Sequence, residues 1–211
     1  MSAPIQLGGI ALKPKQDVRV LGVWIDTKLK WKSHAREITR KMTSQKQGLH
    51  RVTASTWGAT FGHARQVYNA VVRSALSFGA PVWHKPSRNP AKVQGLARQL
   101  EKHQNECLRT VAGAYKATPI RQLETETFIP PLATYLNRRV AAYHLRQENS
   151  NVRVEIRQTC NKIRGRLLGR RRKASPPTPA VAKEAWAKRW RGEAQTKEEL
   201  DKIMLQEWQD Q

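Results

Sequence analysis

The 211-residue sequence has few cysteines, few acidic residues and no long apolar run. Two cysteines, Cys107 and Cys160, are too few for a disulfide framework or a Cys-rich zinc site, and they suit a reducing compartment. No stretch approaches the roughly 18 consecutive apolar residues of a membrane span. The start of the chain, from Met1 to Lys15, lacks the basic and apolar blocks of a signal peptide. We therefore expect a nuclear or cytoplasmic protein that is neither secreted nor held in a membrane.

Carboxylates are scarce, and this scarcity bears on catalysis. A polymerase or nuclease that uses two metal ions needs clustered acids to hold cations about 4 Å apart. Before residue 100 the acids are only Asp17, Asp26 and Glu37, and the sequence contains no Asp-Asp pair. It also lacks a phosphate-cradling Gly-rich loop and a nucleophile elbow, and its six histidines are scattered singly. The residues therefore predict no catalytic site, no metal site, no cofactor and no small-molecule ligand.

Basic residues, in contrast, are abundant. The chain has 39 Lys and Arg against 16 Asp and Glu, a net charge of +23. The net charge is +8 for residues 1–60, +6 for 61–134, +10 for 135–173 and −1 for 174–211. A continuous basic body is thus followed by a near-neutral tail. Such a charge favours long polyanions as partners, and nucleic acid is the expected one.

The residue pattern predicts a mainly helical fold. Apolar residues recur every three or four positions after His34, after Gly62, and from Val93 to a helix stop at Gly113. Ser33 is the expected N-cap of the first helix, the second runs out at residues 79–81, and prolines precede two further helices, at Pro119 and at 130–131. The expected architecture is a helical bundle, which the resemblance described below makes thumb-like, with one or two short strands at its N-terminal end and a separate helical tail.

One expected strand, Val18 to Ile25, raises a question of pairing. A lone strand leaves its backbone amides without partners, which is costly when they are buried. The strand either pairs with Ile5 to Leu12, which is a weak candidate, or its partner lies outside this chain. We favour the second alternative, in which the chain is the end of a larger protein.

Composition changes divide the chain further. Three prolines in four residues, Pro176, Pro177 and Pro179, cannot continue a helix and indicate an extended linker. We predict five segments: a strand segment at 1–26, a helical domain at 27–148, a basic extension at 149–173, a Pro-rich linker at 174–182 and a Trp-containing helical tail at 183–211.

Two groups of cations are candidate nucleic-acid contacts. The first lies on the polar face of the first helix, where a merely solvated face is an equally good interpretation: Arg36, Arg40, Lys41 and Lys46. The second lies beside the Pro-rich linker and suits nucleic-acid contact or nuclear import, the alternative being a charged segment with no dedicated receptor. It consists of Arg164, Arg166, Arg170, Arg171, Arg172 and Lys173.

The seven tryptophans also fall into two groups. Four of them, Trp24, Trp31, Trp57 and Trp83, lie in or beside apolar elements, so core packing is favoured over base stacking. Three lie in the polar tail. Because Trp186 and Trp190 are four residues apart, they share one helical face, which either docks back onto the body or meets a partner.

Six strings in order resemble a known family over about residues 17 to 148. They are 21–26 (LGVWID), 29–31 (LKW) with His34, 55–58 (STWG), Arg65 with Tyr68 and 70–72 (AVV), 78–83 (FGAPVW), and 113–119 (GAYKATP) with 130–132 (PPL). This series resembles the thumb and post-thumb region of reverse transcriptases from non-LTR (LINE-type) retrotransposons, particularly fungal ones.

The resemblance implies a function and its limits. In that family the strand at 21–26 closes the palm, and the helices after it form the thumb that holds the RNA or DNA template–primer. The catalytic carboxylates and their Mg²⁺ belong to the palm, so no catalytic residue carries over to this chain. The implied partners are the template–primer and the palm domain. A stand-alone basic nucleic-acid-binding module and a protein-interaction fragment that uses the Trp tail stay open as alternatives.

Overall fold

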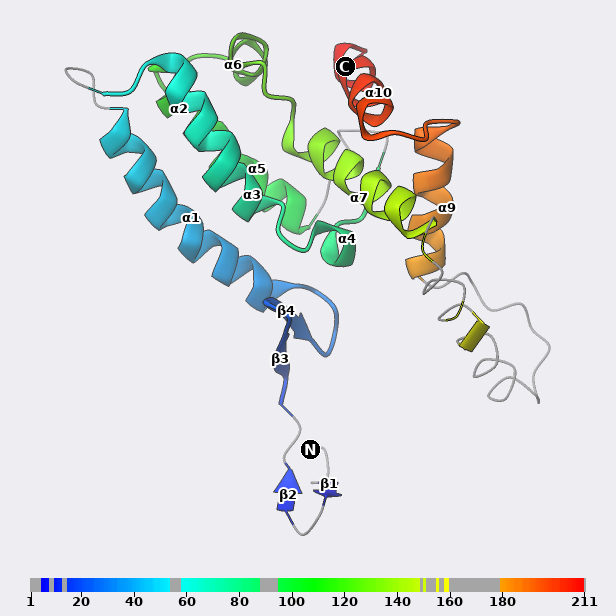
Figure 1. Cartoon of the computed structure of the whole chain (residues 1–211). Helices are drawn as coiled ribbons and strands as arrows, with labels where there is room; N and C mark the ends of the chain where they lie inside the picture. The colour runs from blue at the N-terminus through cyan, green and yellow to red at the C-terminus, as the bar shows by residue number, and fades with distance from the viewer. Residues whose placement is uncertain are drawn as a thin grey trace. The chain divides into compact units, whose positions relative to one another are not determined.

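The computed structural model describes residues 5–7, 10–12, 15–53, 58–87, 95–148, 150, 155, 158–159 and 179–210. The described part is mainly helical, as predicted, with short strands near the N-terminus (Figure 1). The chain forms two compact units. Unit 1 comprises Met1–Gly79 and Gln94–Phe128, and unit 2 comprises Ala80–Val93 and Ile129–Gln211.

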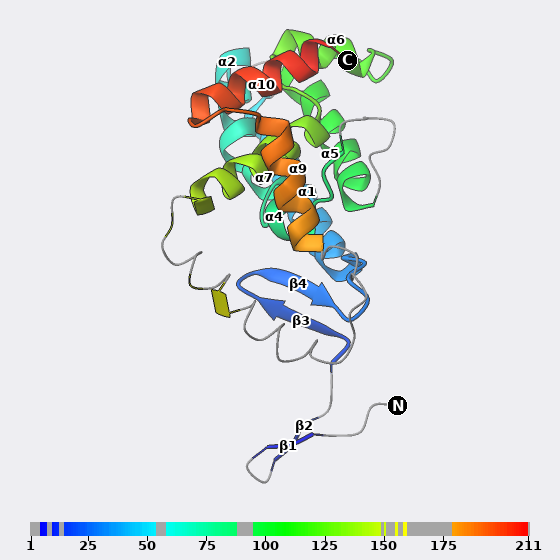
Figure 2. The same ribbon diagram turned by 90° about the vertical axis from the view of Figure 1, so that its right-hand side faces the viewer.

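The predicted single strand is two strands. β3 (Asp17–Val20) and β4 (Val23–Asp26) pair antiparallel, with Val20 opposite Val23 (Figure 2). Leu21 and Gly22 form the turn with φ of 48° and 88°, the backbone that a tight two-residue hairpin needs. Each strand therefore supplies the other's partner, so the premise that the strand has no partner within the chain is wrong.

The weaker candidate strand also folds on itself. Within residues 5–12, β1 (Ile5–Leu7) pairs antiparallel with β2 (Ile10–Leu12) and not with β3. Each of the two described sheets thus pairs two strands that follow one another in the sequence.

The first long helix is α1 (Lys32–Val52), close to its predicted range. Its buried face carries His34, Ile38, Met42 and Leu49, as the spacing indicated. The start differs from the prediction: Trp31 is the N-cap residue, and Ser33 lies inside the helix. The Ser33 hydroxyl donates to Asp17 Oδ2 at 2.7 Å, so it ties α1 to β3 instead of capping the helix.

The second predicted helix is continuous but contains a π-helical turn. It runs through α2 (Phe61–Val67), η1 (Tyr68–Val72) and α3 (Arg73–Leu76). Gly79, at φ 66°, ends this region as predicted, but a short helix that was not predicted, α4 (Ala80–Trp83), begins directly after it. Proline is compatible with a first helical turn, so Pro81 does not prevent this.

α5 (Leu96–Ala112) and α6 (Ile120–Thr127) complete unit 1. α5 ends at Gly113, at φ 60°, as predicted. It packs alongside α1, and the core between the helices holds Cys107, which is fully buried. Burial raises the pKa of this thiol to about 11, so Cys107 is the small inert core residue that the sequence indicated.

Unit 2 is built on α7 (Leu132–Glu148), against which α4, α9 (Pro179–Arg191) and α10 (Lys197–Gln209) pack (Figure 1). α9 begins within the segment 174–182 that was assigned to the linker. α10 starts with a capping box, in which Glu199 N–H donates to the Thr196 hydroxyl and Thr196 N–H donates to the Glu199 carboxylate.

The tail tryptophans join the core of unit 2. Trp186 and Trp190 stack with ring centroids 5.8 Å apart, and Trp190 Nε1 donates to Glu207 at 2.8 Å. Trp190 packs with Ala141 of α7 and with Leu200 and Met204 of α10. The docking alternative for the tryptophan face is therefore confirmed.

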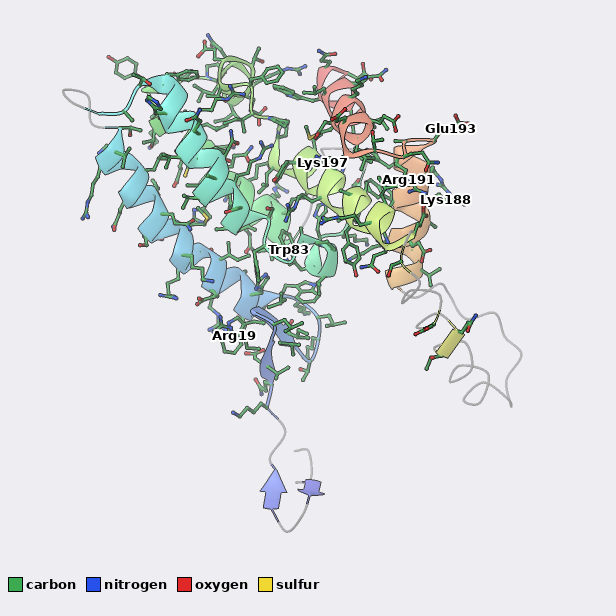
Figure 3. All side chains as sticks on the ribbon, viewed as in Figure 1. Arg19, Trp83, Lys188, Arg191, Glu193 and Lys197 are labelled. Carbon is green, nitrogen blue, oxygen red and sulfur yellow. The ribbon has the colours of Figure 1, made fainter. Side chains whose placement is uncertain are left out.

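Three polar contacts add to that docking. Arg138 Nη2 on α7 donates to Asp201 Oδ2 at 2.8 Å, and Arg191, labelled on α9 in Figure 3, pairs with Glu148. The Lys183 ammonium donates to the backbone carbonyls of Pro81 at 3.1 Å and Val82 at 2.7 Å, at the end of α4.

Candidate nucleic-acid interface

An open groove of about 840 Å³ lies in unit 1 between the N-terminal ends of α1 and α5. Among the described residues that line it, four are cations and none is acidic. The remaining described lining residues are one tryptophan, one leucine and four small or polar residues. The described lining residues are Lys30, Trp31, Lys32, Ala35, Arg36, Thr39, Arg40, Gly95, Leu96 and Gln99.

The periodicity of α1 places these cations in one row. Lys32, Arg36 and Arg40 are four residues apart, so they share a helix face with a spacing of about 6 Å along the axis. The adjacent face is buried through His34, Ile38 and its apolar neighbours, which fixes the rotation of α1. Burial of one face thus keeps the three basic side chains exposed toward the groove.

The second wall comes from the start of α5. Gly95 is its N-cap residue at φ 70°, and no side chain caps the first turn. The amino end of this 17-residue helix carries a partial positive charge from its backbone dipoles. It adds to the potential of the four cations, so the electrostatics of the groove favour an anionic ligand.

A turn held by Asp26 positions Trp31. The backbone N–H groups of Trp31 and Lys30 donate to the Asp26 carboxylate at 2.8 and 3.0 Å. Partial burial raises the pKa of Asp26, but these hydrogen bonds outweigh it and hold the pKa below its usual value. Leu29 and Trp31 have φ of 49° and 60°, an uncommon backbone for residues other than glycine.

The four cations predicted on α1 have different environments. Arg36 and Arg40 line the groove, whereas Lys41 and Lys46 are not among its lining residues. Arg40 pairs with Glu37 at 2.9 Å, and its hydrogen bond is the main cause that lowers the Glu37 pKa. Lys41 lies 3.9 Å from the same carboxylate.

Lys46 has an acidic partner on the neighbouring helix. Its ammonium lies 2.6 Å from Glu106 Oε2 on α5. Exposed pairs of this kind contribute little to stability and exchange readily. Arg36 and Arg40 are the stronger candidates for phosphate contact because they line the groove, whereas Lys46 does not line it and pairs with α5.

The sequence did not single out Lys30 or Lys32, nor did it predict Trp31 as the aromatic wall of the groove. Trp31 was assigned to the core, but it is half-buried and lines the groove. Trp83 was also predicted to pack in the core, and this prediction is confirmed, because its side chain is buried at 5% exposure. The available signal was the string 29–31, in which an aromatic residue lies between two lysines.

The second predicted cluster, Arg164, Arg166, Arg170, Arg171, Arg172 and Lys173, lies outside the described residues.

The described residues contain no group of three or more His, Cys, Asp or Glu side chains that could hold a metal ion. His84 is buried, and its Nε2 lies 2.9 Å from Asn137 Oδ1, so it has a structural role in unit 2. Across the described ranges, none of the helices is both long enough and apolar enough to span a membrane.

Two curated proteins are similar to this sequence. The first is a retrovirus-related Pol polyprotein from the type-1 retrotransposable element R1 4 of Nasonia vitripennis, 24% identical over 192 residues, which are 90% of this chain and 46% of the wasp protein. The chain resembles retrotransposon polyproteins. The second is a 115 kDa protein in the type-1 retrotransposable element R1DM of Drosophila melanogaster, 27% identical over 93 residues, 44% of this chain and 9% of the fly protein.

These relatives support the retrotransposon origin that the six strings indicated. Both are insect proteins, so they do not confirm the fungal type. The chain spans less than half the length of either relative. No protein-family model matches the sequence, and no solved structure matches it.

Proposed function

We propose that this chain is the nucleic-acid-binding thumb region of a retrotransposon reverse transcriptase. In this role it holds the template–primer through the basic face of α1 and does not itself catalyse polymerisation. The observation that carries the proposal is the groove, where the part of the lining that the structure describes has four cations and no acid. The similarity to a Pol polyprotein supports the same role.

The physical basis of such binding is charge neutralisation. Lys and Arg side chains that contact phosphates release counterions from the nucleic acid, so affinity falls steeply as salt rises. Phosphate contacts position the ligand without reading its sequence. A thumb needs this property because it must hold every sequence that the polymerase copies.

Binding is tested by fluorescence anisotropy with a labelled RNA–DNA duplex across a salt series. Arg36→Ala and Arg40→Ala should each weaken binding on all sequences alike and reduce the slope of log affinity against log salt by about 1. Lys202→Ala, an exposed lysine on α10, is the matched control and should change neither quantity. Equal effects of all three substitutions would refute a localised interface.

The lack of catalysis has its own test. The chain alone, incubated with a primed RNA template, nucleotides and Mg²⁺, should extend no primer. Extension that survives purification to homogeneity would contradict this part of the proposal.

The Trp tail does not favour the protein-interaction alternative. Trp190 is buried at 6% exposure against α7 and α10, and Trp186 stacks on it. The apolar face that motivated the alternative is therefore used within unit 2.

A further inference from the structure

We propose that the groove between α1 and α5 binds a single-stranded segment of nucleic acid, with one base stacked on the Trp31 indole. Lys30, Lys32, Arg36 and Arg40 would then neutralise the phosphates on either side of that base. This inference deepens the proposed function and depends on it, since it specifies which form of nucleic acid occupies the groove.

The size of the groove favours a single strand. Clefts of about 300–1,000 Å³ enclose a small ligand, and this groove measures about 840 Å³. One or two nucleotides fit such a space. A duplex is a wide cylinder that presents phosphates outward and keeps its base faces stacked inside, so it can lie across the groove but cannot place a base in it.

The composition of the groove points the same way. Proteins that bind single strands combine a positively charged groove with aromatic side chains on which bases stack. Here a single tryptophan lies among four cations, and the row of Lys32, Arg36 and Arg40 continues away from it along α1. A duplex-binding face needs the cations but has no use for the indole.

The turn before α1 holds Trp31 in place. Its N–H donates to Asp26 Oδ1 at 2.8 Å, and its carbonyl accepts from the Ala35 N–H at 2.8 Å. Its left-handed backbone, with φ of 60°, is strained for a residue with a side chain. The fold thus places an aromatic ring at the groove through a strained backbone, and a ring already positioned loses little freedom when a base stacks on it.

Other exposed aromatic residues in unit 1 offer a comparison. Tyr115 is 87% exposed and is not among the lining residues of the groove. The Arg65 guanidinium carbon lies over the Phe128 ring, 5.8 Å from the centroid of that ring. Tyr115 is therefore the matched control for an aromatic residue that is accessible but has no cationic groove around it.

The test compares two probes of about 12 nucleotides, within the usual range of site sizes: a single-stranded oligouridine and a blunt RNA–DNA duplex. Trp31→Leu should weaken binding of the single strand about tenfold and change duplex affinity by less than about twofold. Trp31→Phe should restore most of the loss because it restores a ring. Tyr115→Leu should leave both affinities unchanged.

Three outcomes would overturn the inference: equal losses on both probes for Trp31→Leu, no loss on the single strand, or the expected loss appearing for Tyr115→Leu instead. If the wild-type chain binds neither probe at low salt, the proposed function itself fails, which is a different result.

A second measurement needs no substitution at Trp31 and so does not depend on the variants folding. The wild-type chain is photocrosslinked to the same oligouridine carrying 5-iodouracil, and the adduct is located by peptide mass spectrometry. The inference expects the adduct on the peptide that contains Trp31. An adduct confined to peptides outside the groove would refute it.

Discussion

The Asp26 carboxylate accepts hydrogen bonds from the backbone N–H groups of Trp31 at 2.8 Å and Lys30 at 3.0 Å. Asp26 ends β4, and Trp31 precedes the first residue of α1. One acidic side chain thus determines how the chain turns from the hairpin into the helix. It also fixes the position of the groove's aromatic wall.

Asp26→Ala should release this turn. Without the carboxylate, the left-handed backbone at Leu29 and Trp31 loses its support, so the unfolding temperature should fall by a few degrees and single-strand affinity should fall several-fold. Thermal unfolding followed by circular dichroism, together with anisotropy, measures both effects. Asp17→Ala, which removes the Ser33 contact but no turn hydrogen bond, is the control for a general loss of hairpin docking. Equal loss of affinity in the two variants would contradict a specific role for Asp26.

Glu124 should make the protein less stable as pH rises toward neutrality. Burial, reinforced by the charge of Glu101, raises the pKa of Glu124 to about 7 from an ordinary 4.5. A carboxyl whose pKa is raised in the folded state binds more protons there than in the unfolded state, so stability falls as pH rises from about 4.5 to about 7.

Glu124→Gln removes this titration. The variant should gain unfolding temperature relative to the wild type at about pH 8 and show little gain at about pH 4.5. Glu126→Gln, an exposed glutamate on the same helix, is the control. A constant difference between variant and wild type across this range would contradict the assignment.

His84 should make the protein less stable as pH falls into the acidic range. Burial lowers the pKa of His84 to about 4, below its ordinary 6.5, although the Asn137 hydrogen bond opposes the shift. The unfolded state then binds the proton more readily than the folded state. Stability from this group is fully present above about pH 6.5 and is lost as pH falls toward about 4.

His84→Gln keeps a hydrogen-bonding side chain without this titration. It should therefore flatten the acid limb of the stability profile, measured by urea unfolding between about pH 4 and 7. A profile as steep as that of the wild type would show that other groups cause the acid loss.

Leu200→Ala should destabilise unit 2. Leu200 is fully buried and packs with Trp190 and Ala141, so its truncation leaves a cavity that costs about 2–5 kcal/mol. Val181→Ala on α9, where the side chain is 47% exposed, should cost less than about 0.5 kcal/mol. Urea unfolding of both variants measures the difference, and similar costs would contradict the docking of α10 on α7.

Helix periodicity in the sequence predicted most of the fold. α1 and α5 were located because their apolar residues recur every three or four positions, and Gly113 ends α5 as expected. The hairpin was missed because its turn residue Leu21 extends an apolar run. Leu21 is 94% exposed in the structure, and only Gly22 signalled a reversal.

The candidate interface was predicted in part. Arg36 and Arg40 follow from the polar face of α1, because the buried face determines the exposed one. The contribution of Gly95 and Gln99 depends on how α5 packs beside α1, which is a tertiary relationship without a local signal. Trp31 was assigned to the core because large aromatic residues are usually buried, and here its hydrogen bond to Asp26 supports the left-handed backbone that places it at the groove.

The docking of α9 and α10 on α7 has a consequence for chain connectivity. Their attachment includes the core around Trp190 and Leu200, the Arg138–Asp201 and Arg191–Glu148 ion pairs and the Lys183 contacts with α4, and none of these depends on the covalent link between residues 148 and 179. Two separately expressed polypeptides, divided within that link, should therefore reassemble without a peptide bond between them. The protein could then be used in split form, in which the smaller polypeptide, containing α9 and α10, carries a label or a cargo to the larger one.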